Sequence, residues 1–380
     1  MTGLSPQDAA HAPLAPSSAH IWLYCSASVG MQASYPEPET EDSLQGTAAH
    51  WYVSEYLNGR DVPIGSVDPN GIPITAEMID CAQGILIDIR DTYAAAGPES
   101  SFFVEQRVYS ALVHEQNWGT PDAQLTDHVN KTIHLWDYKF GHRFVDAREN
   151  KQMIDYAIGA MNGIPSADWP HWKVTLNIAQ PRNYHEMGPL REWRLDGKTL
   201  LDHWVPIYYE AAKKAMGPNP ELVTGEYCRD CSARHACPAL QQAAAYSIDV
   251  SLQEAPIDLP AHALGLELRH IDDAIKRLKA RQTGLEEQAL SAIRGGTTIP
   301  FFTAKHSTGR LAWEVPAEQV FALGDLFGVE LRKDREPITP TQAINAGIDT
   351  ATVNEMADRP RGAVRLERAD DDAARLAFQQ

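Results

Sequence analysis

The sequence predicts a mixed α/β fold, in which helices flank a mixed central sheet, followed by a mainly helical C-terminal extension. Between residues 100 and 216, segments rich in β-branched and aromatic residues alternate with helical patterns, which favours a sheet covered by helices. Beyond about residue 245 the patterns are almost entirely helical. Hydrophobic residues make up 43% of the chain and charged residues 22%, a composition typical of globular proteins.

Two long helices are expected ahead of the sheet. Residues 1–16 are rich in Ala, Pro and His and are predicted to form a flexible lead. An acidic entry opens a helix over Glu37–Asn58, and a Pro/Gly-rich loop over Val62–Pro73 follows it. The second helix is expected from about Thr75 to Ala95, because Gly97-Pro98 then ends the helical pattern.

The sheet itself is expected from four strand patterns, with one helix inserted before the last strand and one after it. The strands are predicted at Ser101–Val113, Trp118–Leu125, Thr132–Phe140 and Trp172–Ala179, and the helices at Asp146–Ala160 and Gly197–Met216. The turn-like residues 127–130 separate the second and third strands, so these two are expected to be antiparallel neighbours.

The C-terminal part is expected to contain a charged amphipathic helix over His262–Ile293, ended by Gly295-Gly296. A hairpin over Ile299–Val315 and short helices from Pro316 onward complete the expected pattern. The predicted organisation is therefore a flexible N-terminus (1–16), a core domain (17–245), a helical segment (246–294) and a C-terminal extension (295–380).

The formal net charge of −18 excludes a surface carpeted with Lys and Arg. A nucleic-acid partner would then be held by a local basic patch or through metal ions. Arg229, Arg234 and the segment Lys276–Arg281 are the candidate contacts, although a charged helix is more often only a solvated face. No apolar run approaches the ~18 residues of a membrane span, and Met1–Ser18 lacks the features of a signal peptide. These observations predict a cytoplasmic protein without a membrane partner.

Three of the five cysteines lie close together, at Cys228, Cys231 and Cys237, in a C-x2-C-x5-C pattern followed by proline. An odd number of cysteines in a chain without a secretion signal does not suggest disulfides. Thiolates at this spacing can face one metal centre, which is either a zinc ion or an iron–sulfur cluster and needs a fourth ligand. Cys25, Cys81 and the imidazole of His235 are the candidates for that ligand.

The two isolated cysteines differ in their surroundings. Cys25 follows a short helix that Ser17 or Ser18 can cap. Cys81 lies inside a helical pattern with apolar faces, where a lone cysteine is usually a small buried hydrophobic residue.

Several ionisable residues on the predicted core are candidates for a catalytic or metal-binding role. Asp137 and Lys139 are two residues apart on one strand and therefore point to the same side of the sheet. Asp122, on the neighbouring antiparallel strand, can reach the same place, and His50 on the first helix adds an imidazole. Two carboxylates and an imidazole form a half-shell that suits Mg²⁺ or Mn²⁺.

Each of these short motifs is common in proteins when it occurs alone. Together, the motifs predict an enzyme that hydrolyses phosphodiester bonds. Lys139 beside the metal can orient or deprotonate an attacking water, or stabilise a developing negative charge. Gln152 and Tyr156 lie one turn apart on the following helix and can touch a nucleic-acid strand beside the metal; the alternative is that they only pack.

The order of these pieces resembles the RecB-like branch of the PD-(D/E)XK nuclease superfamily, whose core resembles that of restriction endonucleases. The match runs through Gly46–His50, Glu105, Gly119–Asp122, Asp137-Tyr138-Lys139 and Gln152–Tyr156. The resemblance implies that His50, Asp122, Asp137 and the Tyr138 backbone carbonyl bind the metal ion. It further implies that Asp122, Asp137 and Lys139 are catalytic. Gln152, Tyr156 and Glu105 would assist near the DNA.

The cysteines are similar to those of one branch, which includes CRISPR-associated adaptation nucleases and a helicase–nuclease subunit. Members of that branch carry one cysteine before the nuclease core and three after it, and these bind a [4Fe–4S] cluster. Cys25, Cys228, Cys231 and Cys237 fit that layout, whereas Cys81 does not. The resemblance covers roughly residues 17–240, and the whole chain also resembles an uncharacterised family of phage nucleases.

The expected function is that of a Mg²⁺- or Mn²⁺-dependent deoxyribonuclease, an exonuclease rather than an endonuclease, acting on DNA ends or single strands. Phage-type recombination or end processing is the expected setting, and a single-strand annealing protein is an expected partner by analogy. No G-x4-G-K-[ST] pattern is present, so no ATP-driven motor is expected on this chain. The alternatives are a non-catalytic nucleic-acid-binding module and, for the cysteines, a zinc knuckle.

Overall fold

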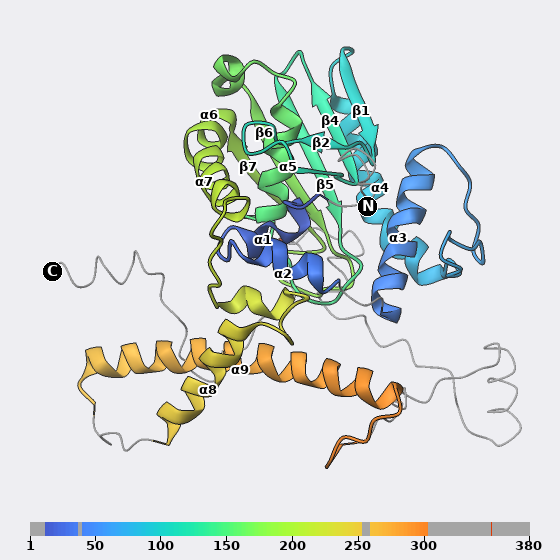
Figure 1. Ribbon diagram of the computed structural model, residues 1–380. Helices are drawn as coiled ribbons and strands as arrows, with labels where there is room; N and C mark the ends of the chain where they lie inside the picture. The colour runs from blue at the N-terminus through green and yellow to red at the C-terminus, as the bar shows by residue number, and fades with distance from the viewer. Residues whose placement is uncertain (1–11, 37–39, 253–258, 303–350, 352–380) are drawn as a thin grey trace, which may run out of the picture. The chain divides into compact units, whose positions relative to one another are not determined.

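The computed structural model describes residues 12–36, 40–252, 259–302 and 351 (Figure 1). The chain divides into two compact units, residues 1–320 and residues 321–380. Everything described below belongs to the first unit. The predicted hairpin over Ile299–Val315 and the short helices after it lie largely outside the described residues, and residues 295–302 contain no strand.

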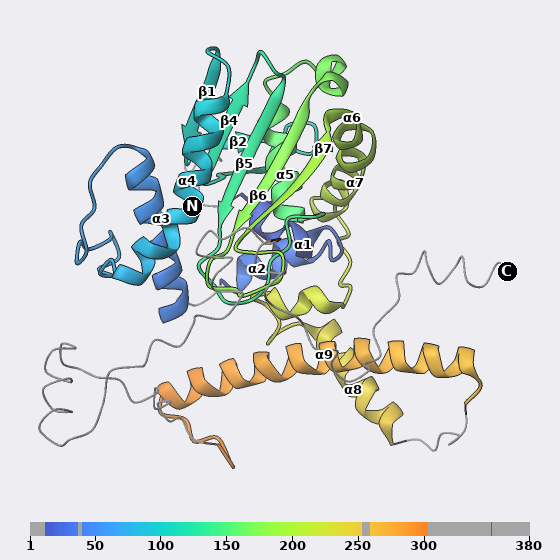
Figure 2. The ribbon, with the colours of Figure 1, turned by 180° about the vertical axis from the view of Figure 1, so that it is seen from behind.

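A five-stranded mixed sheet forms the centre of the unit, as the sequence predicts (Figures 1 and 2). All neighbouring strands are antiparallel except β5 and β6, which are parallel. The spatial order is β1 (Ser100–Val104), β4 (Ala123–Asp127), β5 (Thr132–Tyr138), β6 (Lys173–Ala179) and β7 (Leu190–Asp196). The edge strand β7 was not expected, because its sequence, Leu-Arg-Glu-Trp-Arg-Leu-Asp, carries charges at four of its seven positions.

The first two predicted strands are each broken in the structure. After β1 the chain turns at Glu105, whose positive φ of 51° takes it out of the extended region. The following residues form a separate hairpin of β2 (Val108–Tyr109) and β3 (Trp118–Gly119), and the chain rejoins the main sheet at β4. Asp122 therefore lies in the linker between β3 and β4, one residue before the strand on which the sequence placed it.

Helices cover both faces of the sheet, and the alternation along β5 separates two cores. Ile133 and Leu135 face a cluster with α5 (Lys151–Met161) and α7 (Val205–Ala215). Trp136 and Tyr138 face the opposite cluster, with α3 (Glu41–Leu57) and α4 (Ala76–Ala95). The first cluster also includes Trp22, which lies on the short N-terminal helix α1 (Ala19–Trp22). The 3₁₀ turn η1 (Pro16–Ser18) precedes this helix.

Side-chain caps fix where the site-bearing helices begin. Thr40 and Ser43 form a reciprocal capping box at α3, and Thr75 accepts from the Met78 N–H at α4. Asn150 accepts from the Met153 N–H at 3.1 Å and so begins α5 immediately before Gln152. These three helices agree with the sequence prediction to within a few residues.

The remaining helices follow the sheet or precede it. The predicted helix over Gly197–Met216 is confirmed as α6 (Gly197–Thr199), a π-helical turn (Leu200–Trp204) and α7. The described residues also include α2 (Ser28–Ser34), η2 (Ser166–His171), η4 (Glu226–Asp230), α8 (Pro238–Ser251) and α9 (Ala261–Arg294). The long amphipathic helix is thus confirmed as α9, and none of the described helices is long and apolar enough to cross a membrane.

A buried aspartate joins the β2–β3 hairpin to α5. Asp155 is fully buried. Its carboxylate accepts hydrogen bonds from Ser110 Oγ at 3.0 Å and from Asn117 Nδ2 at 3.1 Å. Burial raises the pKa of Asp155 from its ordinary 3.8 to about 7, although the two hydrogen bonds oppose the shift.

We expect Asp155→Asn to change how stability depends on pH. Folded Asp155 holds its proton more tightly than unfolded Asp155, so stability falls as pH rises from the ordinary aspartate range to about 7. The slope from this group is at most about 1.4 kcal/mol per pH unit. Urea denaturation from about pH 5 to about pH 8 should therefore show the variant gaining on the wild type as pH rises. Parallel stability curves for the two proteins would contradict this assignment.

Candidate active site and cysteine cavity

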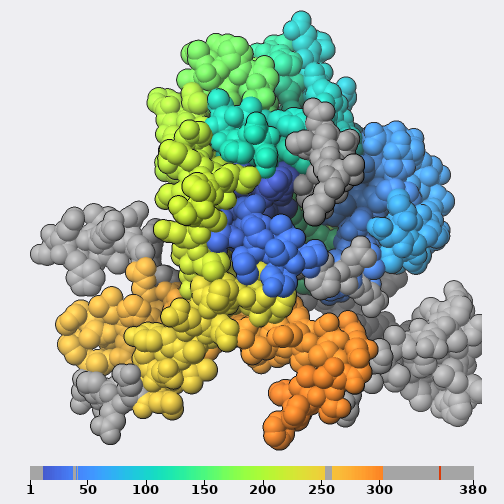
Figure 3. Space-filling view, in the orientation of Figure 1, coloured from blue at the N-terminus to red at the C-terminus, as the bar shows by residue number. Residues whose placement is uncertain are grey.

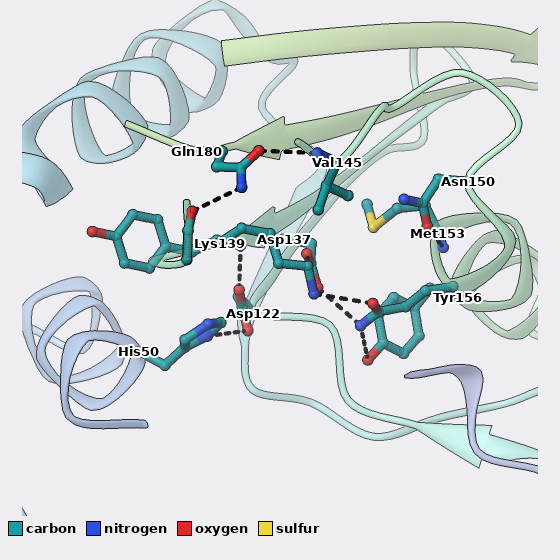
Figure 4. Close-up of polar contacts among 12 residues, drawn as sticks. His50, Asp122, Asp137, Lys139, Val145, Asn150, Met153, Tyr156 and Gln180 are labelled. Carbon is teal, nitrogen blue, oxygen red and sulfur yellow. Dashed lines mark hydrogen bonds and ion pairs between the residues drawn. The ribbon is translucent and has the colours of Figure 1, made fainter. Parts of the chain in front are cut away.

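Asp137, Lys139 and Gln152 form a closed polar triangle on the α5 side of the sheet. Figure 4 shows Asp137 and Lys139 with Tyr156 and Asp122 close by. Lys139 Nζ lies 2.8 Å from Asp137 Oδ2 and donates to Gln152 Oε1 at 3.0 Å. Gln152 Nε2 donates to Asp137 Oδ1 at 3.0 Å and to the Tyr156 hydroxyl at 3.1 Å. The structure thus brings the Asp-x-Lys pair together with the polar face of α5, as the two-residue period of a strand requires.

Asp122 and His50 meet beside this triangle. Asp122 Oδ1 lies 3.1 Å from His50 Nδ1, and Asp122 Oδ2 accepts the Tyr138 backbone N–H at 2.5 Å. The register Ala123↔Trp136 explains the placement, because one further step along both strands sets Asp122 beside Asp137. The Tyr138 N–H therefore takes part in the site, while the role expected for its carbonyl stays a prediction.

The charges of the site are strongly coupled. Burial lowers the pKa of the His50 imidazole, but the Asp122 carboxylate outweighs burial and leaves that pKa above its ordinary value. Burial raises the pKa of Asp122, yet His50 and the Tyr138 N–H bring it below its ordinary value. Burial also raises the pKa of Asp137, against the attraction of Lys139. The pKa of Lys139 rises because Asp137 outweighs its desolvation. Lys139 is therefore a cation in this arrangement.

Tyr156 and Glu105 border the same site. A Cβ on Gly119 would lie 2.8 Å from the Tyr156 ring and 2.7 Å from Pro16, so the glycine makes room for the ring. Packing therefore explains why position 119 is a glycine. It does not explain Gly46, because a Cβ there would meet open space. The Glu105 N–H donates to the Asp122 carbonyl at 3.1 Å, and burial together with the Asp122 charge raises the pKa of Glu105 to about 7.

The donor set fits a hard divalent cation by its chemistry, but the carboxylates are engaged with protein partners. Asp137 Oδ2 is buried and accepts no hydrogen bond from the described residues, its close cation being Lys139. As these side chains are placed, no group of three or more His, Cys, Asp or Glu residues in the described part of the chain is gathered closely enough to hold one metal ion. In the candidate active site, Asp122 pairs with His50 and Asp137 pairs with Lys139.

Four of the five cysteines line one cavity. Cys25, which follows α1, meets Cys228, Cys231 and Cys237 from the segment after α7. Apolar side chains close the cavity around them: Ile21, Met31, Leu222, Val223, Ala233 and Leu240. Figure 3 shows the N-terminal helices, in dark blue, lying against this yellow segment. Residues about 200 positions apart in the sequence thus share one small, mostly apolar site.

The thiols influence one another's ionisation. Burial raises the pKa of Cys231 to about 11, and its three cysteine neighbours add to the shift. Cys81 lies on α4 and packs against the opposite core, away from the cavity. His235, the candidate imidazole ligand, does not line the cavity; its ring lies edge-on to Tyr35 with centroids 4.9 Å apart.

Helix α9 docks on the cysteine segment through small residues. Ala280 packs beside Cys228 and Leu240, and Gly284 lies against the His235 backbone. Arg234 forms an ion pair with Glu287, with Nε 3.1 Å from Oε2, and Arg281 donates to the His235 carbonyl at 2.7 Å. Arg234 and the basic stretch of α9 were expected as nucleic-acid contacts. In the structure, Arg234 and Arg281 instead form contacts between α9 and the cysteine segment.

We expect Gly284→Ala to loosen this docking and to lower stability by about 1–3 kcal/mol. The new Cβ would lie 2.8 Å from both Cα and N of His235, and backbone cannot yield as a side chain can. Gly265→Ala is the matched control on the same helix, since a Cβ there meets open space and favours the helix. Equal loss of stability in both variants by urea denaturation would refute the close approach.

Sequence reasoning missed a charged cluster beside the cysteines. Asp230 lies 2.6 Å from Arg143, 3.4 Å from Arg229 and 3.5 Å from His20. These contacts join three segments of the chain. His20, Arg229 and Asp230 also line a surface hollow of about 420 Å³, together with Tyr24, Lys151, Glu226 and Tyr227. Residues spread from position 20 to position 230 carry no spacing that could have indicated the cluster.

A protein family matches most of the chain. A family of proteins described as of unknown function, DUF2800, matches residues 11–335. The match covers most of the chain, including the sheet, the candidate active site, the cysteine cavity and α9. The chain therefore belongs to the DUF2800 family.

Proposed function

We propose that this protein is a Mg²⁺- or Mn²⁺-dependent DNA exonuclease of the RecB-like PD-(D/E)XK type. The observation that supports it best is the meeting of Asp122, Asp137 and Lys139 where β4 and β5 run side by side, with His50 and Gln152 against them. A structural core has little use for three ionisable groups and an imidazole in so small a space, because burying charge is costly.

In this proposal Asp122, Asp137, His50 and the Tyr138 carbonyl hold the cation. When bound, the metal ion would polarise the scissile phosphate and lower the pKa of a water molecule. With Asp137 holding the cation, Lys139 would be free to stabilise negative charge on the phosphate. Gln152 keeps Lys139 in place through its Oε1 and presents its amide beside the Tyr156 hydroxyl to the DNA strand.

We further propose that Cys25, Cys228, Cys231 and Cys237 hold a [4Fe–4S] cluster. Four thiols around one apolar cavity supply the ligand number that such a cluster needs. A zinc ion is the competing occupant, and it would leave the protein colourless. Phage-type recombination, with a single-strand annealing protein as partner, remains the proposed setting.

The test is digestion of end-labelled DNA by protein purified without exposure to air. Duplexes with 5′ or 3′ tails, blunt duplexes and single strands should be compared in Mg²⁺, Mn²⁺ and excess chelator. We expect metal-dependent loss of nucleotides from ends, and the label that disappears first gives the polarity. Binding of DNA without cleavage in either metal would overturn the exonuclease proposal and identify a binding module.

A further inference from the structure

Helix α9 carries an apolar row that its docking leaves unused. The row recurs at alternating steps of three and four residues over about four heptads: Leu264, Leu268, Ile271, Ile275, Leu278, Gln282, Leu285, Ala289 and Ala292. Such a repeat is the pattern of a coiled-coil seam, in which the first and fourth positions of each heptad face a partner helix. We call these nine residues the seam.

The seam lies on the side of α9 opposite the docked side. Ala280 and Gly284, the buried residues of α9, fall between the seam positions at roughly half a turn from them. Ile275 is 58% exposed and Leu285 45% exposed, although both flank the docked centre of the helix. Figures 1 and 2 show α9 extending to both sides of its contact with α8.

An exposed row of this length calls for a partner. From Leu264 to Ala292 the seam is about 42 Å long at 1.5 Å per residue. Large exposed apolar patches on a protein surface usually mark an interaction site. A single polar position inside such a row, here Gln282, commonly selects one register at a cost in stability.

The charges beside the seam favour a second copy of the same helix in antiparallel orientation. Glu267 and Asp272 flank the N-terminal half of the seam, and Lys279, Arg281 and Glu286 flank the C-terminal half. In an antiparallel pair Asp272 of each copy meets Lys279 of the other, which gives two attractive contacts. In a parallel pair the repulsion between Glu267 and Asp272 of the partner would offset the attraction between Arg281 and Glu286.

We propose that the protein forms a two-fold symmetric dimer through an antiparallel coiled coil of two α9 helices. The docked sides face outward, so each copy carries its cysteine cavity and polar site on its own side of the coil. This proposal does not depend on the nuclease proposal, because it rests only on α9.

Sedimentation velocity of the full-length chain tests the proposal directly. We expect a particle of twice the 42.0 kDa chain mass. Ile275→Lys should raise the dimer dissociation constant about a hundredfold or more, because it places a charge in the seam. Leu266→Lys is the matched control, since Leu266 is 55% exposed on the same helix but lies off the seam, and it should leave the dimer intact.

Charge exchange tests the orientation. Asp272→Lys and Lys279→Glu should each weaken an antiparallel dimer, and the double variant should restore it. Asp272 also pairs with Lys276 of its own helix at 3.1 Å, so Lys276→Gln serves as the control for losing that contact. In a parallel dimer Asp272→Lys would strengthen association, which would overturn the orientation. A wild-type monomer at high micromolar concentration would overturn the proposal, whatever then covers the seam.

Discussion

Replacing Asp137 with asparagine should reduce metal-dependent cleavage of linear DNA by about a thousandfold or more. The asparagine has the same shape but removes the buried charge that faces Lys139 and that we assign to the cation. Because Gln152 still accepts from Lys139 Nζ, the local fold should persist. End-labelled digestion with Mg²⁺ gives the rate, and far-UV circular dichroism confirms that the variant is folded.

Asp155→Asn is the matched control for this variant. Asp155 is also a buried carboxylate, but its partners are Ser110 and Asn117 on the β2–β3 hairpin. It should retain wild-type cleavage. Full activity of Asp137→Asn, or equal losses in the two variants, would mean that the Asp137 carboxylate has no part in the chemistry.

Replacing Cys228 with serine should remove the bound group and lower the melting temperature by about 10 °C or more. The four cysteines join the segment after α1 to the segment after α7, and a group held between them stabilises both. Visible absorption, iron and zinc content, and thermal unfolding measure the two consequences together.

Cys81→Ser separates this effect from the loss of any thiol. Cys81 lies against the opposite core and should change neither metal content nor absorption. Stoichiometric zinc in a colourless wild type would replace the cluster with a zinc site. A wild type that holds neither metal, with a Cys228→Ser variant of unchanged stability, would leave the cavity as packing alone.

The parts of the site that could be predicted are those governed by local periodicity. Asp137 and Lys139 meet because a strand repeats every two residues, and Gln152 and Tyr156 meet because a helix repeats every 3.6. The pairing of β4 with β5 followed from a short connecting turn. The expected sheet and the long α9 helix followed from the same kind of pattern.

The parts that could not be predicted depend on contacts between distant segments. The charges along β7 hide a strand that only pairing with β6 stabilises. The break at Glu105 separates β1 from a hairpin that packs on α5, and no local pattern indicates it. The docked side of α9 is likewise set by contacts with a distant segment, such as that of Gly284 with the His235 backbone.

The junction between the N-terminal segment and residues 221–237 bears on how the chain is made. The Ala27 N–H donates to the Glu221 carbonyl at 3.0 Å, and the Glu221 N–H donates to Ser26 Oγ at 2.7 Å. Residues near position 25 leave the ribosome early, but their partners follow almost 200 residues later. At about 5–20 residues per second, the first helices wait roughly 10–40 seconds before that junction can close. The order of synthesis therefore delays the cysteine site until the whole sheet has been translated.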